Sequence, residues 1–407
     1  MPAINVLKYP AKLLPMKTDA SRNETLPPPA LPRTAEKSGL AKKLIAVLAS
    51  FTILATGTTV LLITFDAPAA ARLTDNYLRP LLGPDLVVSL EKIYYNSADK
   101  LHQITYRPGS NQGPAFLEPP ETASAASQLD LTPIPTNNGL RPLRGEGVWV
   151  NRPLSTFPGE EIMAYTFVRP DITRPYANVT LVQMDMKVLH LSAVAGTAQP
   201  GGPVGRPGPG LIPPATVRSG RLIAAFDGGF QYRDGQYGMI VGHTTYLPLR
   251  QDIGTLIGYK NGALKIVNYT GQDLGTGIEF VRQNCPILID HGELSVVNPK
   301  NKALWGRTFS SDMYTWRSGL GLTAGGDLIF AVGNSLSPVS LAYALKMAGA
   351  ESAIQLDINP YWVRFNIFDS LGNGQYQTST LIKGIQDGSK EYLHGYIKDF
   401  FYIYQNA

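Results

Sequence analysis

Two aspartates stand where apolar stretches of the sequence end, and catalytic side chains are often found at such places. Asp227 follows the apolar stretch Arg221–Phe226. Asp357 follows Ala353–Leu356. Each aspartate is therefore expected where a buried strand opens into a loop, and a carboxyl group there can give or take a proton during a reaction. The structural alternative for Asp227 is an ordinary Asp-Gly turn, because Gly228 comes next.

Arg317 is a third candidate, because the residues beside it leave room for a ligand. It alternates with Gly319 and Gly321 on one face of a predicted strand. Two positions without side chains leave open space above the sheet, next to the guanidinium group. The alternative is a structural ion pair between Arg317 and Asp357 that ties two strands together.

The same part of the sequence predicts the elements that would position these side chains. Ser318–Thr323 and Leu328–Val332 are mostly apolar, and a turn signal separates them, so both are expected to be strands. Ser337-Pro338 is typical of a helix start, and Gly349 is typical of a helix end. Ala353–Ile358 is expected to be a third strand, whose apolar residues share one face.

Further short apolar runs with turn signals between them predict more strands. They are Ile162–Val168, Asn178–Gln183, Lys187–Val194, Arg221–Phe226, Thr255–Tyr259, Leu264–Asn268 and Asp399–Tyr404. The proline- and glycine-rich stretch Gln199–Pro214 is interpreted as a long surface insertion, with a domain boundary as the alternative.

Other residue types give weaker signals. Arg282–Asn284 precedes the apolar run Pro286–Ile289 and could line a pocket or form a solvated turn. The five histidines show no ligand spacing, so no metal site is predicted. Cys285 is the only cysteine, so the chain forms no intrachain disulfide, and this residue is expected to be a small buried hydrophobic side chain.

An uncharged run near the N-terminus predicts a membrane anchor. Leu44–Phe65 contains no charged residue and is long enough to cross a bilayer. Lys42-Lys43 precedes it, which places the polar, proline-containing tail 1–43 in the cytoplasm. A cleaved signal peptide is the alternative, but the polar region before the run is long and the run exceeds the usual length for such a peptide.

The rest of the chain divides into three predicted parts. Residues 67–107 are expected to form a juxtamembrane helical segment that lies near the membrane or packs on the next domain. Residues 110–138 are rich in Pro, Ala and Ser, as is typical of a linker. Residues 140–407 form the main domain, which the positive-inside pattern places outside the cell.

The charge distribution argues against nucleic acid as a partner of the main domain. The chain has 36 Lys and Arg residues against 31 Asp and Glu residues, which gives a net charge of +5. Residues 1–43 hold eight of the basic residues and three of the acidic ones, so 28 of each remain after residue 43. Binding to a phosphate backbone needs a concentrated basic surface.

The order of four motifs resembles the phosphodiester glycosidase family, to which the lysosomal uncovering enzyme belongs. The motifs are Phe226-Asp227-Gly228-Gly229-Phe230, Pro286–Gly292, Arg317–Gly321 and Leu356-Asp357. The resemblance runs from about Leu140 to the C-terminus and, with the anchor, fits a bacterial, membrane-attached branch. Two positions depart from the family, which commonly has Asn at the position of Asp227 and a glycine-rich loop after Asp357.

The resemblance implies an α+β domain with mixed sheets, placed after one N-terminal transmembrane helix. Glycoside hydrolysis usually needs two carboxyl groups, and Asp227 and Asp357 are the candidates. Arg317 would hold the phosphate, because its planar fork matches phosphate oxygens. The candidate substrate contacts are Gly228, Gly229, Phe230, His243, Asn284, Ser318, Asn359 and Trp362. Packing or a solvated loop is the structural alternative for the side chains in this set.

The implied function is a membrane-anchored, extracytoplasmic hydrolase that removes a sugar from a phosphodiester-linked glycoconjugate, without a cofactor or metal. The alternative is a non-catalytic envelope protein that binds a cell-wall or surface polysaccharide, with the pocket kept and the chemistry lost. In both cases the expected partners are a glycan and the lipid bilayer that holds Leu44–Phe65.

Overall fold

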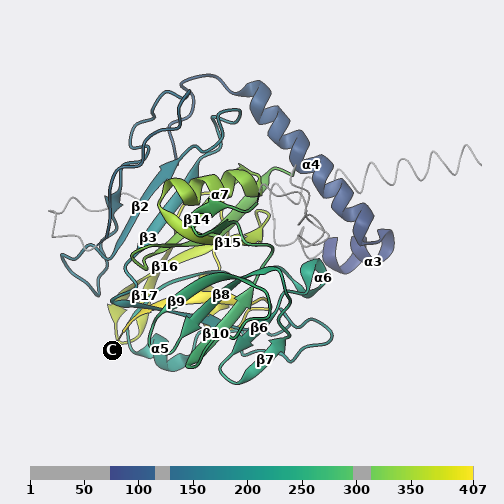
Figure 1. The fold of residues 1–407 in the computed structure, drawn as a ribbon, viewed down its shortest axis with the longest axis vertical. Coiled ribbons are helices and arrows are strands. Elements are labelled where there is room, and N and C mark those ends of the chain that lie inside the picture. Colours follow the sequence, from purple (N-terminus) through teal and green to yellow (C-terminus); the bar gives the residue numbers. More distant parts are fainter. Residues whose placement is uncertain (1–73, 115–128, 297–312, 407) are drawn as a thin grey trace, which may run out of the picture. The chain divides into compact units, whose positions relative to one another are not determined.

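The computed structural model describes residues 74–114, 129–296 and 313–406 (Figure 1). The predicted tail 1–43 and the uncharged run Leu44–Phe65 lie outside the described residues, so the anchor stays a prediction. Within the three described ranges, no helix combines the length and the apolar character needed to cross a membrane.

A helical segment opens the described part of the chain. It consists of η1 (Thr74–Leu78), a π-helix, followed by α3 (Arg79–Leu82) and α4 (Pro84–Thr105). On α4, the Asp99 carboxylate accepts hydrogen bonds from the Arg174 guanidinium and the Tyr176 hydroxyl, each at 2.9 Å. The Asn96 side chain accepts a bond from the backbone N–H of Tyr314 at 3.1 Å. The predicted helix is therefore present, and it packs on the strands that follow.

The largest sheet among the described residues has eight strands. Its order is β1 (Val150–Asn151), β2 (Met163–Val168), β3 (Val179–Met184), β14 (Leu328–Leu336), β13 (Thr315–Thr323), β15 (Ala350–Ile358), β11 (Ile289–Asp290) and β12 (Glu293–Leu294). Its members β2, β3, β14 and β15 lie in the upper half of Figure 1. The strands predicted for this region are confirmed, and β13 and β14 extend a few residues beyond the predicted bounds.

Two further sheets of the described ranges have five strands each. The first has the order β17 (Gln375–Thr380), β16 (Phe365–Gly372), β5 (Leu222–Asp227), β18 (Phe400–Gln405) and β4 (Leu189–Val194). The second has the order β7 (Thr244–Leu247), β6 (Met239–Val241), β10 (Ile278–Gln283), β8 (Ile253–Tyr259) and β9 (Leu264–Tyr269). Three short helices lie between strands: α5 (Pro214–Arg218), α6 (Tyr232–Gly235) and α8 (Ser389–His394).

Helix α7 (Pro338–Met347) begins where the sequence predicts. The Ser337 hydroxyl accepts a hydrogen bond from the Ser340 backbone N–H at 3.1 Å, and the Ser340 hydroxyl accepts one from the Ser337 N–H at 2.9 Å. This capping box satisfies backbone donors that would otherwise lack partners at the helix start. Leu341 and Leu345 are fully buried and join the apolar cluster on one face of the eight-stranded sheet.

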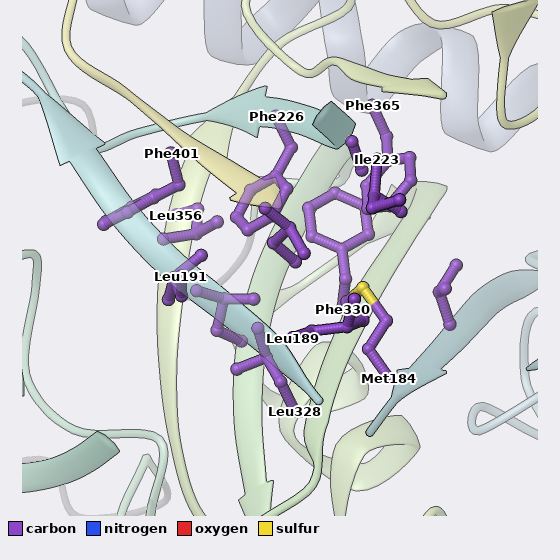
Figure 2. Packing of buried hydrophobic residues seen from close by; sticks show 14 of the residues in the cluster. Met184, Leu189, Leu191, Ile223, Phe226, Leu328, Phe330, Leu356, Phe365 and Phe401 are labelled. Atoms are coloured by element: carbon purple, nitrogen blue, oxygen red, sulfur yellow. The ribbon is translucent and has the colours of Figure 1, made fainter. Parts of the chain in front are cut away.

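The main apolar core draws side chains from all three sheets. Figure 2 shows Phe226 of β5 close to Phe365 and Phe330. The rings of Phe226 and Phe365 are stacked with centroids 5.5 Å apart, and Phe330 lies 5.1 Å from Phe226. This packing fixes the sheet that carries Asp227 against the sheet that carries Asp357, because Leu356 belongs to the same core.

The strand pairing corrects one expectation about the fold. The resemblance implies mixed sheets, but the strand pairs of the described ranges are antiparallel throughout. Many neighbouring strands are joined by short turns, as in β13–β14 and β8–β9, and such turns permit only antiparallel pairing. The α+β character is confirmed in the coarser sense of antiparallel sheets with few helices.

Candidate active site

The two predicted acids come together, although they end strands of different sheets. Asp227 Oδ2 accepts hydrogen bonds from the Ser318 hydroxyl at 2.6 Å and from the backbone N–H of Asp357 at 3.1 Å. Asp227 Oδ1 accepts a bond from the backbone N–H of Arg364 at 2.8 Å. Three donors therefore hold this carboxylate, and it in turn holds the end of β15.

Asp357 faces a small cavity, whereas Asp227 lies behind it. The cavity has a volume of about 20 Å³, roughly the room of one water molecule. Its walls come from α3, the loop and helix after Asp227, the loop after Asp357, and Lys398. The lining residues are Arg79, Phe230, Gln231, Arg233, Asp234, Asp357, Ile358, Asn359, Tyr361, Trp362 and Lys398.

Lys398 is the cationic partner of Asp357. Its Nζ forms a buried ion pair and hydrogen bond with Asp357 Oδ2. The same ammonium group lies 4.5 Å from the ring centroid of Trp362, within the range of a cation–π interaction. Lys398 thus contacts the Asp357 carboxylate, and Asp227 fixes the backbone of Asp357 by accepting a hydrogen bond from its N–H.

Burial changes the protonation of both acids. It raises the pKa of Asp357 to about 7, a rise that the neighbouring charge of Asp227 reinforces and that Lys398 opposes. Burial also raises the pKa of Asp227 to about 6, although the bonds from Arg364, Ser318 and Asp357 favour its ionised form. A carboxyl group with a pKa near neutrality can exchange a proton at physiological pH.

The glycines after Asp227 make room for a buried ion pair. Arg282 donates two hydrogen bonds to Asp399, at 2.7 and 3.0 Å, and both side chains are about 1% exposed. A Cβ on Gly228 would lie 2.2 Å from Asp399 Oδ2, and one on Gly229 would lie 2.5 Å from Arg282 Nη2. The Gly229 N–H also donates to Asp399 at 3.0 Å. The two glycines therefore pack on Arg282 and Asp399.

Asn284 links the loop after Asp227 to strand β15. Its side-chain oxygen accepts a hydrogen bond from the Phe230 N–H at 2.9 Å, and its Nδ2 donates to the carbonyls of Gln355 and Leu356. The side chain is fully buried and does not line the cavity. It holds the two residues that precede Asp357 and the start of the loop that contains Phe230.

Arg317 is placed on the opposite side of its strand from Ser318, away from the cavity. Its guanidinium donates to the carbonyls of Leu336 at 2.7 Å and Met313 at 2.8 Å, and to the Gln355 side chain at 3.0 Å. The side chain is completely buried, and burial lowers its pKa to about 9. This geometry does not support the predicted contact between Arg317 and a substrate phosphate.

The remaining predicted contacts divide into two groups. Phe230, Asn359 and Trp362 line the cavity, and their contact with a substrate stays a prediction. Ser318 bonds Asp227 and lies behind the cavity. His243 is exposed in the turn between β6 and β7 and is not among the lining residues.

Sequence reasoning missed two charged residues of this site, Lys398 and Asp399. Lys398 pairs with Asp357, and Asp399 pairs with Arg282, although 41 and 117 positions separate the partners. In the sequence, Lys398 and Asp399 are two adjacent charged residues just before the last strand. This pattern does not by itself indicate a site. Among residues 74–114, 129–296 and 313–406, no group of three or more His, Cys, Asp or Glu side chains could hold a metal ion.

Comparisons with known proteins give remote similarities. No family model and no curated protein matches the sequence. The catalytic domain of zebrafish N-acetylglucosamine-1-phosphodiester alpha-N-acetylglucosaminidase, auto-inhibited by its pro-peptide, is similar in structure with a TM-score of 0.38 and 14% identity, over 63% of this chain and 88% of that one.

Two other solved structures show lower similarity. A hypothetical protein from Synechocystis gives a TM-score of 0.33 and 14% identity, over 61% of this chain and 63% of its own. A putative exported protein from Burkholderia pseudomallei gives 0.25 and 10%, over 56% of this chain and 74% of its own.

Proposed function

We propose that the chain is a hydrolase that cleaves a sugar from a phosphodiester-linked glycoconjugate. The observation that carries the proposal is the Asp357 carboxyl group, which faces a cavity, has a pKa near 7 and is paired with Lys398. The motif order around Asp227 and Asp357 supports the same reaction class. Asp357 is assigned the proton transfer and Asp227 a positioning role.

Basic side chains beside the cavity can meet an anionic substrate. Arg79, Arg233 and Lys398 line it together with the acids Asp234 and Asp357, and Arg79 also pairs with Glu91 at 3.0 Å. A phosphodiester brings one negative charge, and a second develops on the leaving phosphate when the bond to the sugar breaks. We assign Lys398 and Arg233 to that phosphate, because both side chains line the cavity and Arg317 does not.

In the proposed reaction the ionised Asp357 accepts a proton from a water molecule that attacks the anomeric carbon. The bond between that carbon and the phosphate oxygen breaks, and its electron pair leaves with the phosphate. A phosphate monoester is a stable leaving group, so cationic side chains can replace a proton donor. A sugar ring needs more room than about 20 Å³, so the side chains from α3 and α6 that line the cavity must move apart for substrate entry.

The test is turnover of a sugar 1-phosphodiester, compared with a neutral glycoside of the same sugar. Wild type should cleave the phosphodiester, and Asp357→Asn should lose activity by about 10²–10⁴-fold, as expected for an acid–base group. Asp290→Asn is the control, because Asp290 also stands at a strand end but lies outside the cavity. Full activity in folded Asp357→Asn would contradict the proposal. No turnover by wild type on a panel of phosphodiesters would favour the non-catalytic glycan-binding alternative.

The proposal includes an extracytoplasmic location on a single anchor. It is supported by the uncharged run Leu44–Phe65 and by Lys42-Lys43 before it. Protease added outside an intact inner membrane should digest the main domain and spare the tail. A mature N-terminus found near residue 70 would instead indicate a cleaved signal peptide.

A further inference from the structure

A second, larger pocket lies at the ends of three inner strands of the eight-stranded sheet. It has a volume of about 410 Å³, enough for a sugar ring with its substituents. The start of β3, the end of β14, the start of β13 and the C-terminal end of α4 form its walls. The lining residues are His102, Thr105, Tyr106, Ser110, Pro114, Tyr176, Asn178, Thr180, Trp316, Gly333, Asn334, Ser335, Ile382 and Lys383. None of them lines the Asp357 cavity.

The lining chemistry is that of a carbohydrate site. Trp316, Tyr106 and Tyr176 are partly exposed in the pocket and offer aromatic faces for a sugar ring. Serine, threonine and asparagine side chains supply most of the polar groups around them, and these can bond to sugar hydroxyls. The lining contains no Asp or Glu, and Lys383 is exposed at its rim, so the pocket favours an anionic substituent.

One buried hydroxyl in the pocket lacks a partner. Thr180 of β3 is only 1% exposed, and its Oγ1 makes no hydrogen bond to the described parts of the chain. A buried polar group without a partner is unfavourable, so such groups are uncommon unless they meet water or a ligand. Ser335, in the same lining, has a φ of +57°, a conformation that is unusual for a residue with a side chain. Strained backbone of this kind gathers at binding sites.

We propose that this pocket binds a sugar unit that carries a carboxylate. The ring lies against Trp316, a sugar hydroxyl bonds Thr180, and the carboxylate meets Lys383. The site is separate from the proposed reaction at Asp357, and the two linings are linked through the backbone, because the Asn359 N–H donates to the Trp316 carbonyl at 3.0 Å. Binding here does not require hydrolysis.

The test is binding of a glucuronic acid-containing disaccharide, followed by tryptophan fluorescence and calorimetry. Thr180→Val keeps the shape of the side chain and removes its unpartnered hydroxyl, so it should lower affinity about three- to tenfold without loss of stability. Thr166→Val is the matched control, because Thr166 of β2 is also 1% exposed with an unpartnered hydroxyl but does not line the pocket. It should bind like wild type.

Two further variants separate the parts of the proposal. Lys383→Gln should remove the preference for the glucuronic acid disaccharide over the neutral disaccharide cellobiose. Asp357→Asn should bind the acidic disaccharide as wild type does, whether or not the protein proves to be a hydrolase. Absence of binding by wild type, equal losses in Thr180→Val and Thr166→Val, or an unchanged preference in Lys383→Gln would each overturn the assignment.

Discussion

At the scale of single residues, the two strand-end aspartates have different tasks. Asp227 receives three hydrogen bonds and lies behind the cavity, whereas Asp357 faces it and pairs with Lys398. The hydrogen bonds of Asp227 fix the position of the neighbouring backbone. The Asp357 carboxyl group, which faces the cavity, is able to exchange a proton. The family resemblance implied that both carboxyl groups take part in the reaction, whereas their neighbours in the structure differ.

This difference predicts unequal effects of replacing each acid. Asp227→Asn puts an amide –NH₂ in place of one oxygen, and at least one backbone N–H then loses its acceptor, which costs about 1–3 kcal/mol. We expect lower stability to denaturant together with a smaller loss of kcat than in Asp357→Asn. Steady-state kinetics and urea unfolding of both variants measure this. Equal loss of kcat in the two variants, with both folded, would contradict the assigned roles.

The sequence indicated where the two acids lie, but it did not indicate which side chains they contact. Apolar runs mark where strands end, so Asp227 and Asp357 could be located. Lys398 lies 41 positions from Asp357, and no local pattern links them. The family resemblance assigned Arg317 to the phosphate, because its planar fork matches phosphate oxygens, and no pattern in the sequence indicated its buried backbone partners. Its guanidinium binds carbonyls instead.

At the scale of elements, the loop after β5 depends on two glycines that contact a buried ion pair. Gly228 has an ordinary φ, so its need for glycine comes from space: a Cβ would lie 2.2 Å from Asp399 Oδ2 and 2.6 Å from its carbonyl oxygen. The loop, the start of β18 and β10 are thereby held together through Arg282 and Asp399.

Gly228→Ala should therefore destabilise the fold by about 1–3 kcal/mol through overpacking. Gly325→Ala is the control, because the nearest atom to its added Cβ is 3.7 Å away and its φ is ordinary. Thermal unfolding should show a clear decrease in Tm for the first variant and little change for the second. A Gly228→Ala protein as stable as wild type would mean that the loop adjusts freely.

Most strands could be predicted because they are apolar, short and separated by turn signals, as in the β8–β9 hairpin around Gly262. Strand partners could not, because β5 pairs with β16 and β18, which lie far along the chain. The helix α7 was predictable in full, since its capping residues and its end are local signals.

At the scale of the whole molecule, the buried acids make stability depend on pH. Asp357 has a pKa of about 7 and Asp227 of about 6, both above the value of about 3.9 for an exposed aspartate. The native state then binds protons more tightly than the unfolded state. Their contribution to stability is complete below about pH 4 and is lost as pH rises through about 6 and 7.

The contribution of Asp357 can be isolated by comparing wild type with Asp357→Asn across pH. The variant leaves Lys398 without its ionic partner, so it should be less stable than wild type across this pH range. Because it has no carboxyl group at position 357, its stability should not change with the protonation of that group. The difference in unfolding free energy should change by on the order of 3 kcal/mol between about pH 4 and about pH 8, with wild type losing more. Parallel pH dependences for the two proteins would show that the Asp357 pKa is not raised.

The central claim is that the Asp357 carboxyl group performs the proton transfer, with its pKa set by burial and by Lys398. The pH dependence of kcat/KM on a sugar 1-phosphodiester tests this most directly. We predict that kcat/KM of wild type rises with pH through about 7 and then levels off. Because Lys398 lowers the pKa of Asp357, Lys398→Met should shift this rise to higher pH. A flat profile in wild type, or one that Lys398→Met leaves in place, would contradict the account.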